Sequence, residues 1–557
     1  MRATREALAA TRVHGSGIPL GGLALPSMRF EVVFLALASA ACTPPPIVDA
    51  PQLPPSPAVL QVSGMDLVGG LGFPVKLRGI SFTNRVWQDD LLPDEHHDDT
   101  DYDRLRDLGM NAVRFYVNAR ALLEEDVPDA DEAPIWRWLE DNVAWARARG
   151  VYLIVDLYVP PNQPMAPDQF VELWRMVAER FRGEPVIAGY AVTVLRAAST
   201  DQGAWQALAG RTAAAIRAVD PEHALFVSLG GGERDALAWT PFLIEDSNVV
   251  YDFRFFEPFD FTHQSAPWEV AAPVDQEYPD VTKVEAPPSL LNRAAGTDGS
   301  PRLPAGDSDW TYYEGAAFQV TDPAIVVGSP TLVCSHNYGK ASFDDLVLER
   351  VNADGLAEPL QRITLDTLAG WHFSSEDDSG LPAVERGGHR GGALSIAGTR
   401  DEAHLSAPVW RFRTQPNATY RLSGWMKGEA IEPGAQCQIR LDFFHASSAL
   451  PARDRDLLAA HLEPYFAWAK EHQVPLFCEF GTIRDSFVHD RGGERWTADM
   501  LDLLIGRGLD FAYLDYHEDF FGLFAGDGSL PDPAYLNEAL ADTLRAKLLV
   551  DEPPENQ

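Results

Sequence analysis

The feature that most constrains the fold of this chain is a regular alternation of short apolar runs with amphipathic helical stretches, starting near residue 75. The apolar runs predict eight strands, at residues 75–81, 112–117, 151–157, 186–194, 224–229, 249–255, 475–480 and 509–515. The periodic stretches predict helices at residues 102–108, 135–149, 167–181, 202–218, 453–471, 498–507 and 534–547. Such alternation favours a parallel sheet, and eight units predict an α/β fold of the (β/α)8 TIM barrel type, with functional side chains at the carboxyl ends of the strands.

The alternation is interrupted once, between the sixth and seventh predicted strands. Residues 420–425 and 438–443 alternate in strand fashion, and the pair Gly387–Gly388 marks a turn. A segment this long cannot be a simple loop, so we expect an inserted, jelly-roll-like β-sandwich. The predicted organisation is a first barrel part at 58–274, the insert at 275–450 and a second barrel part at 451–550.

Residues 1–57 are predicted to be a targeting segment and a Pro-rich linker. The apolar run 32–41 is too short to cross a bilayer, and residues 39–42 resemble a bacterial lipobox in which Cys42 is lipidated. Two alternatives stay open: ordinary secretion, and a misread start without export. We expect an exported protein anchored to a membrane through Cys42, in the periplasm or at the cell surface.

Composition excludes some partners. Lys and Arg number 45 against 82 Asp and Glu, a net charge of −37, which disfavours binding to nucleic acid. The 14 Trp residues hint at sugar-stacking surfaces, although most are expected to pack in the core. Cys334 and Cys437 are candidates for a disulfide in an exported protein, and the cysteines show no metal-ligand spacing. Residues 96–103 suit either a metal site or, as we favour, a helix cap.

Several motifs resemble those of glycoside hydrolase family five, the cellulase-type retaining β-glycosidases. The resemblance rests on residues 111–114, 249–264, 475–481 and 510–516. It implies that Glu479 occupies the nucleophile position, that Arg114 supports it and that both lie at the carboxyl face of one barrel. It further implies a polysaccharide or oligosaccharide partner, no cofactor, and a second carboxyl group about 5–5.5 Å away as acid/base.

The positions that would contact substrate depart from that family. The acid/base position is Leu195, which cannot donate a proton, and the Asn position before it is Val194. The resemblance also assigns substrate-facing positions to Asn118 and, where the family has His, Tyr or Trp, to other residues here. Those residues are Tyr158, Arg254, Phe256 and Leu514.

Two functions therefore compete. The favoured one is a glycosidase-like lipoprotein that recognises β-linked glycans without hydrolysing them. The alternative is an active retaining β-glycan hydrolase of the endoglucanase or mannanase type, with Glu479 as nucleophile and a displaced acid such as Glu233 or Glu257. A third reading uses the barrel as a cell-surface assembly scaffold. His263 is expected to pack in a loop rather than contact sugar.

The insert resembles jelly-roll carbohydrate-binding modules at residues 341–348, 371–373 and 391–396, although the closing-strand motif 341–348 comes first. No metal site is predicted in the barrel, and a structural calcium in the insert stays open. The candidate stacking residues of the insert are Trp310, Tyr312, Tyr313, Trp410 and Trp425.

Overall fold

The computed structural model describes most of the chain after the linker. The described residues are 57–123, 134–160, 165–193, 201–230, 240–268, 276–284, 288–368, 371–407, 410–448, 450, 452–526 and 528–549. Cys42 and the predicted lipobox lie outside them. No helix in this described part of the chain is both long and apolar enough to cross a membrane.

Eight parallel strands close into a barrel in the spatial order β23-β24-β4-β5-β6-β7-β8-β9. This confirms the predicted (β/α)8 fold, and each strand overlaps its predicted run. The strands are β4 Arg78–Phe82, β5 Ala112–Asn118, β6 Tyr152–Tyr158, β7 Ile187–Val192, β8 Ala224–Ser228, β9 Val249–Phe255, β23 Leu476–Phe480 and β24 Asp510–Tyr513. A small sheet of β1 Gln61–Ser63, β2 Asp66–Val68 and β3 Pro74–Val75 precedes them.

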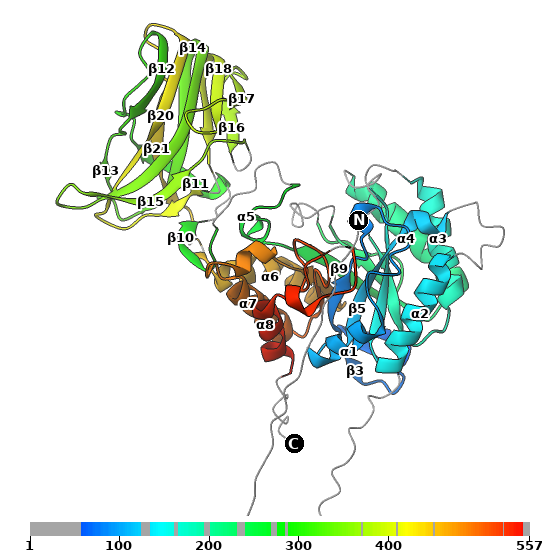
Figure 1. Ribbon diagram of the computed structural model, residues 1–557. Coiled ribbons are helices and arrows are strands. Elements are labelled where there is room, and N and C mark those ends of the chain that lie inside the picture. Colours follow the sequence, from blue (N-terminus) through cyan, green and yellow to red (C-terminus); the bar gives the residue numbers. More distant parts are fainter. Residues whose placement is uncertain are drawn as a thin grey trace, which may run out of the picture. The chain divides into compact units, whose positions relative to one another are not determined.

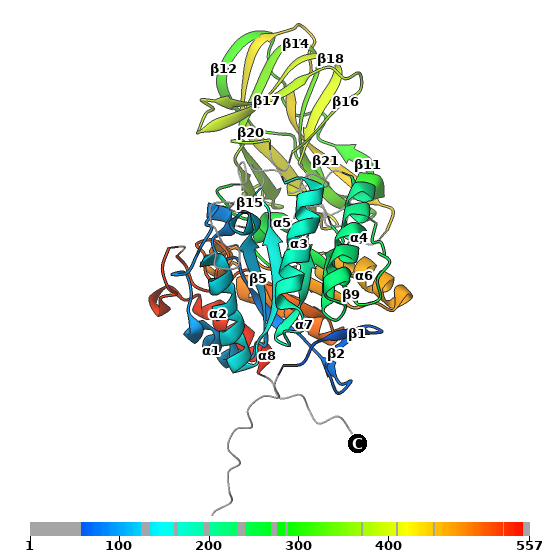
Figure 2. The same cartoon turned by 90° about the vertical axis from the view of Figure 1, so that its right-hand side faces the viewer.

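Helices lie on the outside of these strands (Figures 1 and 2). They are α1 Asp99–Asp107, α2 Pro134–Arg149, α3 Pro167–Phe181, α4 Gln202–Val219, α5 Phe259–Thr262, α6 Arg455–His472, α7 Gly493–Gly506 and α8 Glu538–Leu548. In α3, apolar residues three or four apart form one buried face that includes Phe170, Trp174 and Val177, as an amphipathic helix on a barrel requires.

The acidic run at 96–103 is a helix cap, as favoured from the sequence. The Asp98 carboxylate accepts a hydrogen bond from the backbone N–H of Thr100, and the Asp101 carboxylate accepts one from the N–H of Asp98. The capping residue is thus Asp98. No group of three or more His, Cys, Asp or Glu residues within the described ranges is placed to hold a metal ion.

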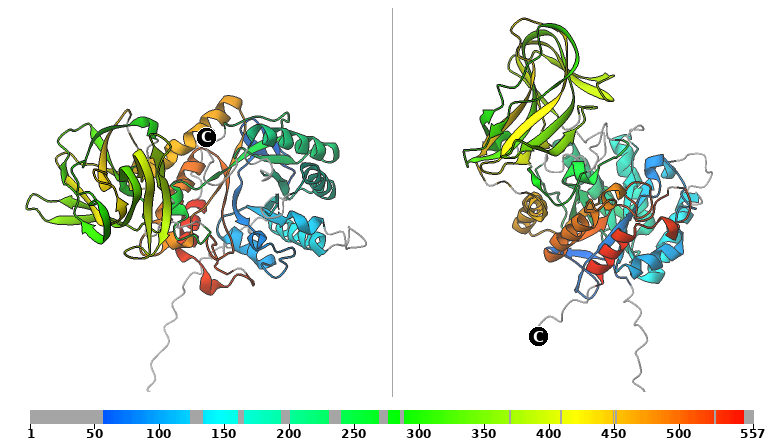
Figure 3. Two further views of the ribbon diagram at one scale, coloured as in Figure 1. Left: turned by 90° about the horizontal axis from the view of Figure 1, so that it is seen from above. Right: turned by 60° about the vertical axis from the view of Figure 1, so that its left-hand side comes forward.

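Between β9 and β23 the chain forms a separate 13-stranded sheet in which every pairing is antiparallel. It surrounds its own apolar cluster, which includes Leu332, Phe343, Leu405 and Leu441. Its strands, most of them visible in Figure 1 and again in both panels of Figure 3, are β10 Asp280–Val284, β11 Leu291–Gly296, β12 Gly306–Tyr313, β13 Phe318–Gln319, β14 Ile325–Val351, β15 Ala357–Ile363, β16 His372–Ser375, β17 Leu381–Arg386, β18 Gly392–Ser406, β19 Phe412–Arg413, β20 Thr419–Ile431, β21 Gln438–Ala446 and β22 Ala452–Arg453.

The 27-residue strand β14 organises the insert. It pairs with β15, β18, β19, β20 and β21, so the motif at 341–348 lies in a central strand rather than a closing one. A disulfide joins Cys334 in β14 to Cys437 beside β21, which confirms the pairing considered from the sequence. The exact domain limits stay a prediction.

Candidate active site

The candidate site is centred on Glu479, which lies near the carboxyl end of β23 between β9 and β24. Its side chain is fully buried, and both carboxylate oxygens are occupied. Ser81 donates to Oε1 at 2.6 Å, and the Tyr116 hydroxyl lies 2.9 Å from each oxygen. Arg254 places its Nε 2.9 Å from Oε2. The carboxylate is therefore fixed by groups from three neighbouring strand ends.

Arg114 anchors this arrangement from below. Its Nε lies 3.6 Å from Glu479 Oε1, so the prediction that these two residues meet is confirmed. The same guanidinium donates to Asp156 on β6 at 2.8 and 2.9 Å and to Asp252 on β9 at 2.9 and 3.0 Å. All four side chains are buried, so the network is shielded from solvent and holds one geometry.

The charge balance of the site favours an ionised Glu479. Burial alone would raise the pKa of its carboxyl group, but Arg114, Arg254 and the hydroxyls of Ser81 and Tyr116 outweigh burial and lower that pKa below its usual value. Three carboxylates, those of Glu479, Asp156 and Asp252, face the two guanidinium groups of Arg114 and Arg254. The carboxyl groups thus outnumber the guanidinium groups, and burial raises the pKa of Asp156 above its usual value.

Arg254 forms the solvent-facing side of the buried carboxylate. Its side chain is 28% exposed, while that of Glu479 is not exposed at all. Its Nη2 also donates to the Tyr116 hydroxyl at 2.8 Å. Arg254 therefore holds Oε2 of the carboxylate from a partly exposed position.

Two of the residues that depart from the family lie in an apolar cluster formed by segments that follow β9, β23 and β24. Phe256 and Leu514 are buried and pack with Ile483 and Phe521. His263 stacks on Phe259, with ring centroids 3.9 Å apart, and its edge contacts Phe256, which confirms its packing role. That Phe256 and Leu514 contact sugar stays a prediction.

An exposed tryptophan lies beside the carboxylate network. Trp87 is 42% exposed, and its ring packs edge-on against Tyr158 at 4.7 Å and tilted against Tyr116 at 6.0 Å. It lies in η1, a short 3-10 turn at Val86–Gln88. The flanking residues Arg85 and Asp89 both have a left-handed backbone conformation. Neither is glycine, so the turn is strained and must be held by its surroundings.

Asn118 provides part of that hold. Its amide donates to the Asp89 carboxylate at 3.0 Å and to the Asp90 carbonyl at 3.3 Å, and its own oxygen accepts from the Arg120 N–H. The side chain is buried. Asn118 thus contacts the residues that follow the turn carrying Trp87, and its predicted role in binding substrate stays a prediction.

A further carboxyl group, that of Asp515, follows β24. Burial raises its pKa to about 7, although hydrogen bonds from Thr83 and the Tyr516 N–H work in the opposite direction. Its oxygens accept from the Thr83 N–H at 3.3 Å, the Thr83 hydroxyl, and the Tyr516 N–H at 2.6 Å. Ser81 and Thr83, two residues apart on one chain segment, thus hold Glu479 and Asp515.

Some predicted residues cannot be placed. Val194, Leu195 and Glu233 lie outside the described residues. Glu257 is described, and one of its carboxylate oxygens accepts from the Phe259 N–H at 3.2 Å. Sequence reasoning missed Ser81, Tyr116, Asp252 and Trp87. Strand alternation offered one signal, because Arg114 and Tyr116 must share a face of β5.

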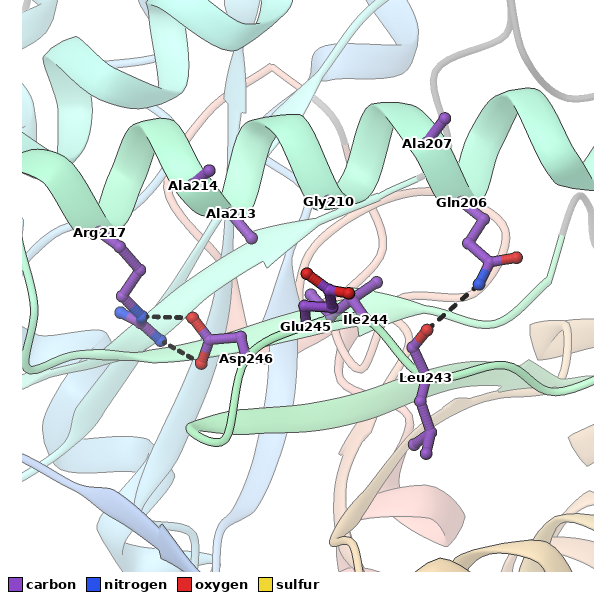
Figure 4. Close-up of a pocket in the computed structure, with 10 residues that line it drawn as sticks. All are labelled: Gln206, Ala207, Gly210, Ala213, Ala214, Arg217, Leu243, Ile244, Glu245 and Asp246. Atoms are coloured by element: carbon purple, nitrogen blue, oxygen red, sulfur yellow. Dashed lines mark hydrogen bonds and ion pairs between the residues drawn. The ribbon is translucent and has the colours of Figure 1, made fainter.

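A pocket beside α4 is a poor candidate for the functional site. It measures about 410 Å³ and lies between α4 and residues 243–246, just before β9 begins, so it is at the amino end of that strand (Figure 4). Arg217 is ion-paired there with Asp246 at 2.7 Å, and Gln206 donates to the Leu243 carbonyl. Functional groups of such barrels gather at the opposite, carboxyl end.

The fold and the site define a (β/α)8 barrel with an ion-paired carboxylate at its strand ends. Residues 68–296 match the family model described as cellulase (glycosyl hydrolase family 5), so this part of the chain is related to that family. The match ends before β23, and Glu479 therefore lies beyond it.

Curated relatives and solved structures are also similar to this chain. Endoglucanase C of Acetivibrio thermocellus is 23% identical over 213 residues, 35% of this chain and 61% of that protein. Cellodextrinase A of Ruminococcus flavefaciens is 24% identical over 189 residues, 30% of this chain and 54% of that protein. The chain thus spans less than two thirds of the length of either relative. Thermotoga maritima Cel5A in complex with mannotriose substrate aligns with a TM-score of 0.44 and 13% identity, over 84% of this chain and 97% of that one.

Proposed function

We propose that this protein recognises β-linked glycans at the mouth of its barrel and does not hydrolyse them. The observation that carries the proposal is the state of Glu479: it is fully buried, with Arg254 on Oε2, Ser81 on Oε1 and the Tyr116 hydroxyl 2.9 Å from both oxygens. A nucleophile needs an oxygen that faces the sugar carbon, and displacing Arg254 would leave a buried carboxylate short of a partner.

The missing acid supports the same conclusion. A general acid contributes typically 10²–10⁴-fold to glycoside cleavage, and the family's acid/base position is Leu195 in this sequence. Without it, the leaving oxygen would depart unprotonated.

Trp87 supports glycan recognition. An exposed indole on a rigid turn offers a flat apolar surface to the C–H face of a pyranose, and little conformational entropy is lost on binding. The similarity to an endoglucanase and a cellodextrinase favours β-glucans as the ligand class. We further propose export and anchoring through a lipidated Cys42, on the basis of residues 32–42 alone.

A second candidate function is retaining hydrolysis with a displaced acid, and Asp515 favours it. A carboxyl group with a pKa of about 7 is half protonated at neutral pH, as a general acid requires. Against it, its oxygens accept hydrogen bonds from two N–H groups and a hydroxyl, which favours an acceptor role.

Aryl β-cellobioside hydrolysis separates the two candidates. A good leaving group needs little protonation, so such a substrate reveals a live Glu479 even without an acid. We expect no turnover above the uncatalysed rate, and we expect the hydrolysis rate of Glu479→Gln to equal that of the wild type. Turnover that disappears in both Glu479→Gln and Asp515→Asn would establish the second candidate instead. In parallel, Trp87→Ala should weaken retardation in gels containing mixed-linkage β-glucan, with the exposed Tyr535→Ala as control.

A further inference from the structure

A short loop between β2 and β3 exposes two large apolar side chains. Leu71 is 88% exposed and Phe73 is 70% exposed. The Gly72 N–H donates to the Gly69 carbonyl at 2.8 Å, and the Gly69 N–H donates to the Phe73 carbonyl at 3.1 Å. These two hydrogen bonds close a tight turn that holds both side chains outward. We call residues 69–73 the apolar tip.

The sheet that carries the apolar tip is fixed to the amino end of the barrel. Leu67 of β2 is fully buried in an apolar cluster with residues of the barrel strands. Lys76 donates to the Gly508 carbonyl at 2.7 Å, just before β24, and the Val62 N–H donates to Asn248 at 2.8 Å, just before β9. Figure 2 shows β1 and β2 at the lower end of the barrel. The tip therefore lies at the end opposite the candidate active site.

Charged residues are scarce in this part of the sequence. Across the whole chain 23% of residues are charged and the net charge is −37, yet residues 50–75 contain one charged side chain, that of Asp66. Its carboxylate is paired with Lys76 at 2.5 Å. A bilayer rich in anionic lipids repels so acidic a protein. The uncharged segment around the tip can meet a neutral surface without the cost of desolvating a charge.

The segment that follows the predicted lipidation site enters the structure beside the apolar tip. A Cβ placed on Gly70 would lie 3.6 Å from the Cβ of Ala58, so Ala58 is next to the tip. Cys42 is sixteen residues before Ala58, and the sequence between them is rich in Pro. A Pro-rich chain spans about 3.1 Å per residue, so a lipidated Cys42 keeps the tip within about 50 Å of a bilayer. This confinement raises the effective concentration of the bilayer at the tip.

We propose that the apolar tip docks on a zwitterionic phospholipid bilayer, with Leu71 and Phe73 buried at the boundary between headgroups and acyl chains. The inference rests on the proposed anchoring through Cys42 for its partner. The lipid limits how far the protein moves from the membrane, and the tip sets its orientation. Because the tip is at the amino end of the barrel, docking turns Glu479 and Trp87 away from the membrane.

Co-sedimentation of the full chain with phosphatidylcholine vesicles tests the tip apart from the lipid anchor. The background is Cys42→Ser, which cannot be lipidated and should bind the vesicles weakly. Adding Leu71→Ser and Phe73→Ser should lower the partition coefficient about tenfold, because two apolar side chains no longer leave water. The matched control adds Leu381→Ser and Tyr338→Ser, which change comparably exposed side chains of the insert, 74% and 65% exposed. It should bind as the background does.

Fluorescence quenching provides a second measurement, which records a gain of signal. In the Cys42→Ser background, Phe73→Trp places an indole at the tip. Brominated phosphatidylcholine should quench a larger fraction of its fluorescence than of the background protein's, whereas Tyr338→Trp should add no quenching. The tip side chains are exposed, so urea unfolding of the tip variants should match that of the background.

Three results would overturn the proposal. They are equal partition of the two serine double variants, equal quenching of Phe73→Trp and Tyr338→Trp, and conversion of a dimer into a monomer by the tip substitutions in light scattering. The last result would make a second copy of this chain the partner of the tip. The proposed anchoring fails separately, if wild type is washed from the membranes of a bacterial host as readily as Cys42→Ser. Partition that depends on the tip would then still support the docking.

Discussion

Two groups of residues near the strand ends differ in kind. Toward β5, β6 and β9 the Glu479 carboxylate belongs to an ion-paired network built on Arg114. The segments after β9, β23 and β24 form instead the apolar cluster of Phe256, Ile483, Leu514 and Phe521. The network holds the carboxylate in place, whereas the cluster lies where the family resemblance predicts contacts with sugar.

This difference separates positioning from chemistry. A network that orients a carboxylate also stabilises the barrel, because its charges are buried and each needs the others. A sugar-contacting surface has no such structural duty, so apolar side chains can fill it without cost to the fold. The network and the cluster should therefore respond differently to substitution.

The largest loss of stability is expected when the ion-paired network around Arg114 is broken. Arg114→Met leaves Asp156, Asp252 and Glu479 buried without their shared cation, and breaking such a cluster costs about 3–5 kcal/mol. Urea unfolding followed by tryptophan fluorescence measures this loss. Arg175→Met removes an exposed helical ion pair and is the control, with no measurable change expected. A small effect of Arg114→Met would mean that the network is dispensable.

The cluster side should matter for stability and not for chemistry. Leu514→Ala opens a cavity among buried apolar side chains and should cost about 2–4 kcal/mol in the same unfolding experiment. Its affinity for mixed-linkage β-glucan should stay at the wild-type value. A loss of glycan affinity without loss of stability would show instead that Leu514 contacts the ligand.

The sequence contained the barrel but only part of the site. Apolar runs predicted every barrel strand. Because the carboxyl ends of parallel barrel strands gather on one face, the sequence also predicted that Arg114 and Glu479 meet. The roles of Ser81 and Asp515 depend on β4 lying next to β24, which are more than 400 residues apart in the sequence. Nothing local indicates such a pairing. Trp87 was missed for another reason, because its exposure depends on a turn held by Asn118 from a different strand.

The insert was harder to predict in detail. Period-two alternation indicated strands, but it does not say which strand is central. Strand β14 carries a bulge at 344–347 and continues through it, so one run of 27 residues pairs with several partners. The burial of Arg440 and Asp442 depends on that pairing. Strand alternation in the sequence would by itself assign both side chains to solvent.

A further prediction concerns the free energy of unfolding at acid pH. His96 and His517 stack with their ring centroids 4.3 Å apart, and each ring donates to the other residue's backbone carbonyl, from His96 Nε2 at 3.0 Å and from His517 Nδ1 at 3.1 Å. These contacts join the segments after β4 and β24. Burial, with help from His517 and His97, lowers the pKa of His96 to about 3. Between that value and about 6.5 the unfolded chain binds a proton that the folded chain does not.

Stability should therefore fall as the pH drops below about 6.5, by roughly 1.4 kcal/mol per pH unit from this group. The measurement is urea unfolding at several pH values for wild type and His96→Gln. We expect the two curves of unfolding free energy against pH to differ in slope only on the acid side. Parallel curves would show that His96 titrates normally. His472→Gln, on the last turn of α6, is the matched control.

The smallest effect is expected for Leu195→Glu, which should not restore hydrolytic activity. Leu195→Glu returns a carboxyl group to the family's acid/base position, yet aryl β-cellobioside turnover should stay at the uncatalysed rate. The substitution leaves two other features unchanged: Arg254 lies 2.9 Å from Glu479 Oε2, and Phe256 and Leu514 remain in the apolar cluster. Adding Arg254→His and Phe256→Tyr to Leu195→Glu removes both obstacles and is the sharper experiment. Turnover in Leu195→Glu alone would show that Arg254 yields to substrate, and the site would then lack only one acid.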